Sequence, residues 1–305
     1  MTVYVVPCGI SILHSLRTRT GPLGATAADF ADRIHGRLRA LPRLPDEQVT
    51  DWWVEQTGAD AEDVRLGAWD PGPLSAETHT LAASTTGSLA EMASRGDTVT
   101  LVASDTGAGI ASALCVAQHL TGPDLTGVTY TTTPAELKDA AVDPRYAAGP
   151  VSIVRLRGLD PRQPRNGFIL AVAGMGLVLR AAFDTGRPVQ VHLTGGYKAT
   201  LLHTLAMSEL LHSLAPDRVS ARYVYEEAGA DAQTHRIELR RFSAEVIEDM
   251  RVELNHVKAG QSPGQPRLRG AAWDIEQGTL RLNAFGYGYL AVLGEAVVGS
   301  IGDTG

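Results

Sequence analysis

The 305-residue sequence has few of the residue patterns that define several large protein classes. Its two cysteines, Cys8 and Cys115, provide neither a disulfide framework nor a zinc-site spacing, which favours a reducing, cytoplasmic setting. No G-x-G-x-x-G follows the first expected strand and no Walker lysine motif occurs, so NAD or ATP is not expected as a cofactor. The nine histidines show no convincing metal spacing with a carboxylate or a cysteine. We therefore expect no cofactor and no metal.

Long apolar runs and an excess of positive charge are also missing. No apolar run approaches the ~20 residues of a membrane-spanning helix, and the start, "MTVYVVPCGIS", lacks the basic region and cleavage pattern of a signal peptide. We therefore expect no membrane association. The formal net charge of −7 argues against a broad duplex-binding surface, which needs a basic stripe. It is compatible with a small anionic ligand, because the groups that line a pocket decide that case.

Apolar, β-branched runs alternate with segments of helical periodicity through most of the chain. Buried strands are expected at 3–8, 97–104, 126–133 and 189–193, with a short extended piece within 150–159 and a closing pair at 219–227 and 235–241. Helices are expected at 25–41, 46–56, 167–186 and 199–214, and also after Ser75 and after Ser104. This alternation predicts an α/β fold, with a Rossmann-like parallel sheet covered by helices on both faces.

The character of the sequence changes near residue 241. A helix with Ser243 as its N-cap is expected first, then a strand pair around Gln277, then a short final helix. We predict a main domain at 1–240 and a small α+β, winged-helix-like domain at 241–305. Tyr287 and Tyr289 are expected to pack inside this small unit, with stacking on an adenine or a dimer interface as alternatives. No role is predicted for the long stretch 18–74.

Three loops follow expected strands: "CGISIL" (8–13), "SDTGAG" (104–109) and "TGGYKA" (194–199). Doubly wound sheets bind ligands at the carboxyl ends of their strands, so the three loops can converge on one site. The last loop places the amides of Gly195 and Gly196 and the charge of Lys198 at the start of a helix, which suits a phosphate. The plain alternative is a tight turn that needs glycine for its backbone conformation alone.

Four segments of the chain resemble the CRISPR-associated Rossmann-fold (CARF) family, whose members sense cyclic oligoadenylates. "VVPCGISIL" resembles the first strand and Gly-Thr-Ser type loop of that family, and "LSAETHTL" resembles its Ala-Glu helix motif. "VASDTGAG" resembles its Ser-Asp-Thr loop, and "LTGGYKAT" resembles its Thr-Gly-Gly-aromatic-Lys motif. The segments occur in the family's order within residues 1–240. Ile10 departs from the family, where a small hydroxylated residue is common, and this puts one ligand contact in doubt.

The resemblance implies a homodimer in which two copies of these loops form one pocket around a cyclic ligand with matching symmetry. It is closest to the ring nucleases of type III CRISPR antiviral systems, and it implies that Ser11 and Lys198 support metal-independent cleavage of the ring by its own ribose 2′-hydroxyls. Cyclic tetra-adenylate is the expected ring, and cyclic hexa-adenylate remains open. The implied ligand contacts are Gly9, Ile10, Ser11, Glu77, Ser104, Asp105, Thr106, Thr194, Gly195, Gly196, Tyr197 and Lys198.

Simpler roles are open for several of these residues. Ser11 is otherwise a helix cap, and Lys198 and Glu77 are otherwise solvated surface side chains. Asp105 and Thr106 are expected to cap the following helix whether or not they also touch the ligand.

Two further functions are open. "RVELNH" places Arg251 and His256 in the Arg-x4-His pattern of HEPN ribonucleases, which would make the chain a ligand-activated RNase with RNA as its substrate. The five-residue spacing is not that of one helix face, and the tail is short for a complete HEPN domain. The other alternative is a non-enzymatic regulator that binds the ring and uses its tail to contact DNA or a protein partner.

Overall fold

The computed structural model describes residues 1–18, 32, 34–57, 75–84, 92, 94–122, 124–133, 150–160, 162, 165–224, 234–258, 266–276 and 278–293. A seven-stranded sheet in the order β3-β4-β2-β1-β5-β6-β7 lies at its centre. The strands are β1 (Val3–Pro7), β2 (Thr98–Ser104), β3 (Val128–Thr133), β4 (Val151–Leu156), β5 (Val189–His192), β6 (Val219–Val224) and β7 (Thr234–Ile237). Every neighbouring pair is parallel except β6 and β7, which are antiparallel. The predicted α/β fold with a mostly parallel sheet is confirmed.

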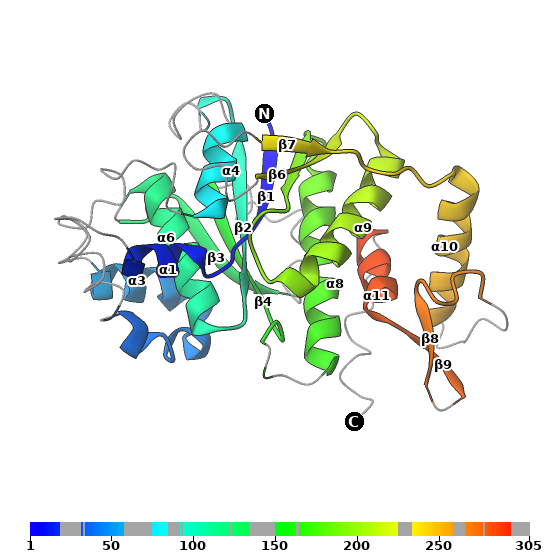
Figure 1. The fold of residues 1–305 in the computed structure, drawn as a ribbon, viewed down its shortest axis with the longest axis horizontal. Helices are drawn as coiled ribbons and strands as arrows, with labels where there is room; N and C mark the ends of the chain where they lie inside the picture. Colours follow the sequence, from blue (N-terminus) through cyan, green and yellow to red (C-terminus); the bar gives the residue numbers. More distant parts are fainter. Residues whose placement is uncertain are drawn as a thin grey trace.

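Helices cover both faces of this sheet, as predicted (Figure 1). On one side lie α1 (Ser11–Thr18), a short 3-10 helix η1 (Leu41–Arg43), α3 (Asp46–Thr57) and α6 (Gly107–Thr121). On the other lie α8 (Arg165–Asp184) and α9 (Lys198–Leu214), while α4 (Ala76–Ser84) packs near β6 and β7. Alternate residues of β1 point to opposite faces: Val3 and Val5 join one hydrophobic core, and Tyr4 and Val6 join the other.

Strand β4 is longer than the sequence indicated. The expected short piece within 150–159 is a fully buried strand of six residues, paired with β2 on one side and β3 on the other. The polar side chains of Ser152 and Arg155 interrupt its apolar pattern, which is why the periodicity understated it. Helix α3 confirms the helix expected at 46–56. Of the helix expected at 25–41, residues 25–31 and 33 lie outside the described residues. The described part is α-helical at 32 and 34–37, forms a turn at 38–40 and enters η1 at Leu41.

The elements expected after residue 241 are confirmed: α10 (Ala244–Lys258), the antiparallel pair β8 (Trp273–Glu276) and β9 (Thr279–Leu282), and α11 (Ala284–Val292). Ser243 caps α10, because its Oγ accepts the Val246 amide at 3.3 Å. Helix α11 packs on α8 and α9, and Tyr289 joins the same hydrophobic core as residues of those helices. The winged-helix likeness and the boundary after residue 240 stay predictions.

Helix α8 corrects one expectation. Its stretch Asn166–Asp184 is apolar and long enough to cross a membrane by length and composition alone, although no apolar run was expected to approach that length. Of its most apolar window, 67% is buried inside the protein, as in the core helix of a folded domain. Helices α9 and α11 and strand β4 pack against it.

Candidate functional site

A cleft with a volume of about 960 Å³ opens at the carboxyl ends of β1, β2, β4 and β5. The loops after β1, β2 and β5 all contribute to its lining, so the three loops singled out in the sequence do converge. The predicted contact residues that line the cleft are Gly9, Ile10, Ser104, Asp105, Thr106, Gly196 and Tyr197. Ile10 and Tyr197 are the exposed apolar side chains of the lining, 60% and 38% exposed, and they are available to contact a ligand base.

The other predicted contact residues do not line the cleft directly. Ser11 and Lys198 each follow a lining residue, Ile10 and Tyr197, in the chain. Ser11 is the first residue of α1 and Lys198 is the first residue of α9, where Lys198 is exposed to solvent. Of the remaining three, Glu77 lies on α4 and accepts the Gly9 amide, and Thr194 and Gly195 begin the loop after β5.

Glu77 connects two of the loops. Its carboxylate is only 1% exposed, accepts the Gly9 amide at 2.7 Å on Oε1 and accepts the Ser11 hydroxyl at 3.0 Å on Oε2. A Cβ at Gly195 would collide with the same carboxylate, so only glycine fits there. The surface alternative for Glu77 is therefore wrong, and the Ser11 hydroxyl donates to Glu77 rather than serving only as a helix cap. Glu77 positions the loop after β1 against the loop after β5.

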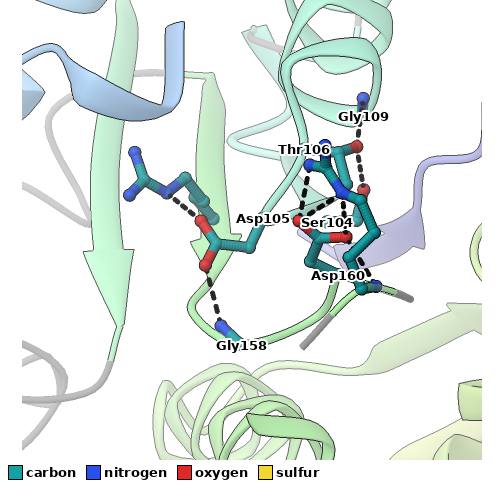
Figure 2. Close-up of polar contacts among 8 residues, drawn as sticks. Ser104, Asp105, Thr106, Gly109, Gly158 and Asp160 are labelled. Atoms are coloured by element: carbon teal, nitrogen blue, oxygen red, sulfur yellow. Dashed lines mark hydrogen bonds and ion pairs between the residues drawn. The ribbon is translucent and has the colours of Figure 1, made fainter. Parts of the chain in front are cut away.

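Two side chains of the loop after β2, Asp105 and Thr106, have different structural roles (Figure 2). Thr106 caps α6, because its Oγ1 accepts the Gly109 amide at 3.0 Å, as predicted. Asp105 does not cap the helix. Its Oδ1 lies 2.9 Å from Arg155 Nε, and its Oδ2 accepts the Gly158 amide at 2.9 Å. Asp105 thus ties the end of β2 to the end of β4, and the capping role expected for it is wrong.

The loop after β5 contains the hydroxyl of Thr194, which makes structural hydrogen bonds, and it leads into the first turn of α9. Thr194 Oγ1 accepts hydrogen bonds from the Thr80 hydroxyl at 3.0 Å and from the Val224 amide at 2.8 Å, so it links α4 to β6. Gly196 has a φ of 95° and packs against Pro7, which only glycine allows without strain. Tyr197 precedes α9 and makes no side-chain capping bond. The positive end of the α9 dipole thus starts beside the lining residues Gly196 and Tyr197, and its N-cap residue supplies no side-chain acceptor.

Four arginines line the cleft, and sequence reasoning missed all of them. They are Arg39, Arg43, Arg155 and Arg162. Asp105 and Asp160 carry the opposite charge. Among the described lining residues, four positive and two negative side chains give a formal charge of +2. Arg155 carried a usable signal, since a lone charged residue inside an apolar strand near its carboxyl end is unusual. Arg39 and Arg43 carried no such signal, because they lie outside the four family-like motifs, in the stretch 18–74 for which no role was predicted.

Cys8 also lines the cleft, but its thiol has low reactivity. Burial raises the pKa of this thiol well above its usual range, and the nearby Glu77 carboxylate raises it further. The thiol therefore stays protonated near neutral pH and is a poor nucleophile. Among the described residues, no group of three His, Cys, Asp or Glu side chains is arranged to hold a metal ion.

Arg251 and His256 lie on α10 and do not line the cleft. Five residues on an α-helix separate them by about 140° around its axis, so one helix does not present both on the same face. Arg251 instead pairs with Glu248 at 3.6 Å.

The site belongs to an α/β protein whose mostly parallel sheet holds a cationic cleft at the carboxyl ends of its strands. No protein-family model matches this chain, and no curated protein matches it at a significant level.

Proposed function

We propose that the cleft binds a cyclic oligoadenylate, with cyclic tetra-adenylate as the first candidate. The observation that carries this proposal is the convergence of the three loops that resemble CARF motifs on one arginine-lined cleft. In an acidic protein a local formal charge of +2 favours an anionic ligand, and Tyr197 and Ile10 offer apolar surface to its bases. Under this proposal residues 1–240 form a CARF domain and the tail is a small winged-helix-like unit.

The proposed assembly is a cytoplasmic homodimer. Two copies of the cleft related by a two-fold axis match a ring of repeating adenylates, whereas one copy contacts only half of such a ring. The proposed activity is that of a ring nuclease, which removes the cyclic messenger of a type III CRISPR system and ends its antiviral signal.

The proposed reaction needs no atom beyond the ring itself. A ribose 2′-oxygen attacks the adjacent phosphorus, the bond from phosphorus to the 5′-oxygen breaks, and the product is linear with a 2′,3′-cyclic phosphate and a 5′-hydroxyl. The proton of the 2′-hydroxyl ends on the departing 5′-oxygen, which balances the step. The Ser11 hydroxyl donates a hydrogen bond to Glu77, so under this proposal its oxygen keeps lone pairs that can accept a hydrogen bond from the 2′-hydroxyl. Under this proposal Lys198, the first residue of α9, and the first amides of that helix stabilise the charge that develops on the phosphate.

The test is incubation of the purified protein with cyclic tetra-adenylate and cyclic hexa-adenylate without added metal, followed by chromatography of the products. We expect ring opening by the native protein and a loss of about 100-fold or more in Ser11→Ala and in Lys198→Ala, in line with the usual worth of such groups. Arg241→Ala, an exposed residue outside the cleft, is the control and should cleave normally. A Ser11→Ala/Lys198→Ala double variant that cleaves at the native rate contradicts the assignment.

A labelled single-stranded RNA in a parallel tube separates the alternatives. RNA that is cut only when a ring is present would instead assign the activity to Arg251 and His256. A ring that binds and is never cut, with RNA intact, would instead make the protein a regulator.

A further inference from the structure

The arginines of the cleft fall into two groups. Arg155 pairs with Asp105 at 2.9 Å, and Arg162 pairs with Asp160 at 2.6 Å, so each lining aspartate already has its cation. Arg39 and Arg43 also line the cleft, and neither has an ion-pair partner within the part of the chain that the structure describes. Among the described residues that line the cleft, Arg39 and Arg43 are therefore the cations that are not paired with a lining aspartate.

The segment that carries these two arginines is fixed to the rest of the site. Leu38, which precedes Arg39, is 7% exposed, and Leu41, which lies between the two arginines, is fully buried. Both belong to the hydrophobic core that also holds α6. The Leu38 carbonyl lies so close to Gly107, the first residue of α6, that a Cβ there would overlap it. Arg39 and Arg43 are four residues apart across the turn at 38–40 and η1, on a wall of the cleft that includes the first turn of α6.

We propose that Arg39 and Arg43 bind phosphate groups of the cleft's ligand. A guanidinium offers paired N–H donors that match two oxygens of one phosphate, and it stays charged at any relevant pH. The dipole of α6 adds positive potential on the same wall, where Gly107 and Ala108 line the cleft. A ligand with one or more phosphate groups fits this wall. This inference deepens the proposed function, since it assigns phosphate contacts in that same cleft to a segment outside the four family-like motifs.

Binding measured by calorimetry tests the inference with two probes, cyclic tetra-adenylate and inorganic tripolyphosphate, which shares only the phosphates. We expect Arg39→Ala and Arg43→Ala each to weaken the binding of both probes by about tenfold or more, as for the loss of a hydrogen bond to a charged group. The salt dependence of binding should fall with each variant, because fewer ion contacts are made. Arg39→Lys and Arg43→Lys should retain part of the affinity, since they keep the charge and lose the paired donors.

Arg241→Ala is the matched control, because it removes an exposed arginine that does not line the cleft. Equal melting temperatures check that the variants fold, and Arg39→Gln and Arg43→Gln provide second substitutions that keep much of the side-chain length.

The possible outcomes distinguish the two proposals. If the native protein binds the ring and the alanine variants bind it equally well, this inference is wrong and the proposed function stands. Tripolyphosphate binding that depends on Arg39 and Arg43, without any ring binding, supports this inference and removes the proposed function. If the native protein binds neither probe, both proposals are wrong.

Discussion

Glu77 connects the loop after β1 to the first turn of α1 beside the cleft. Its buried carboxylate is the acceptor for the Gly9 amide and the Ser11 hydroxyl, and both donors are partly shielded from water. We expect Glu77→Ala to lower the free energy of unfolding by about 1–3 kcal/mol, because it leaves these donors without their acceptor. Urea unfolding measures this loss. Glu55→Ala, an exposed glutamate on α3, should change stability by no more than about 0.5 kcal/mol. Equal effects of the two substitutions would refute the role given to Glu77.

Gly195 and Gly36 offer a matched pair at the same scale. A Cβ at Gly195 overlaps the Glu77 carboxylate, whereas a Cβ at Gly36 meets no atom within 4 Å. Gly195→Ala is therefore expected to destabilise the fold by about 1–3 kcal/mol, the usual cost of overpacking. Gly36→Ala should be neutral or slightly stabilising, since alanine is the better helix former. Thermal melting of the two variants gives the comparison. A Gly195→Ala protein as stable as Gly36→Ala would contradict this prediction, because it would show that the loop accommodates the added methyl group without a loss of stability.

The sequence predicted which residues gather near the cleft better than it predicted what they do. Glu77, Ser11 and Gly195 were all placed in one site by their likeness to motifs. Their mutual contacts were not predictable, because Glu77 and Ser11 are 66 positions apart and only the fold brings them within 3.0 Å. Arg39 and Arg43 lay outside any motif, and an exposed arginine near a helix has no sequence pattern that separates a ligand contact from a solvated side chain.

Helix α11 depends on glycine for its place among the other elements. Its residue Gly288 lies against Met207 of α9 and Val172 of α8, and its Ala291 lies against Gly176 of α8. Small side chains at these crossings let the three helices pack closely in one hydrophobic core.

Gly176→Val tests this packing. A Cβ at Gly176 would stand 2.8 Å from both Ala291 Cβ and the Gly288 carbonyl, so the larger side chain pushes α11 away from α8. We expect a loss of about 1–3 kcal/mol in the free energy of unfolding and a weaker near-ultraviolet circular dichroism signal from the nearby aromatic residues. Gly36→Val, which has open space around it, is the control. A Gly176→Val protein with native stability and spectrum would mean that α11 is not held by this contact.

At the level of elements, periodicity predicted strands and helices well where the pattern was unbroken. The structure confirms the predicted α3, the pair β6–β7 and the hairpin β8–β9. The pattern understated β4, in which Ser152 and Arg155 break the apolar run. It also showed α11 as a helix without showing its partners, since the same glycines suit a surface loop or a close helix crossing.

The whole molecule carries a net charge of −7 while its cleft is lined by more arginines than aspartates. The order of apolar strands and amphipathic helices predicted the parallel sheet, and the parallel sheet dictates that loops meet at its carboxyl edge. The sign of the charge at that edge was not predictable from composition, because four arginines separated by up to 123 positions assemble only in the folded chain.

A buried histidine links the stability of the whole molecule to pH. His192 on β5 is 1% exposed, and the Gln190 side-chain nitrogen lies 2.9 Å from its Nε2. The centroids of the His192 and Tyr4 rings are 5.9 Å apart. Burial, and then the charge of Arg222, lowers the pKa of His192 from 6.5 to about 3. The imidazole therefore remains neutral in the folded protein at pH values where it is protonated in the unfolded chain.

This difference fixes the direction of the pH dependence. Below pH 6.5 the unfolded chain binds a proton at His192 that the folded protein does not bind until about pH 3, so stability falls as the pH is lowered through that window. We expect the native protein to lose about 1 kcal/mol between pH 6 and pH 5 from this group, since the limiting slope is about 1.4 kcal/mol per pH unit. Urea unfolding of the native protein and of His192→Gln at pH 7.5, 6 and 5 isolates the contribution, because the other titrating groups are common to both. The two stability curves should converge as the pH falls, and curves that stay parallel would show that His192 takes up its proton in the folded state as readily as in the unfolded chain.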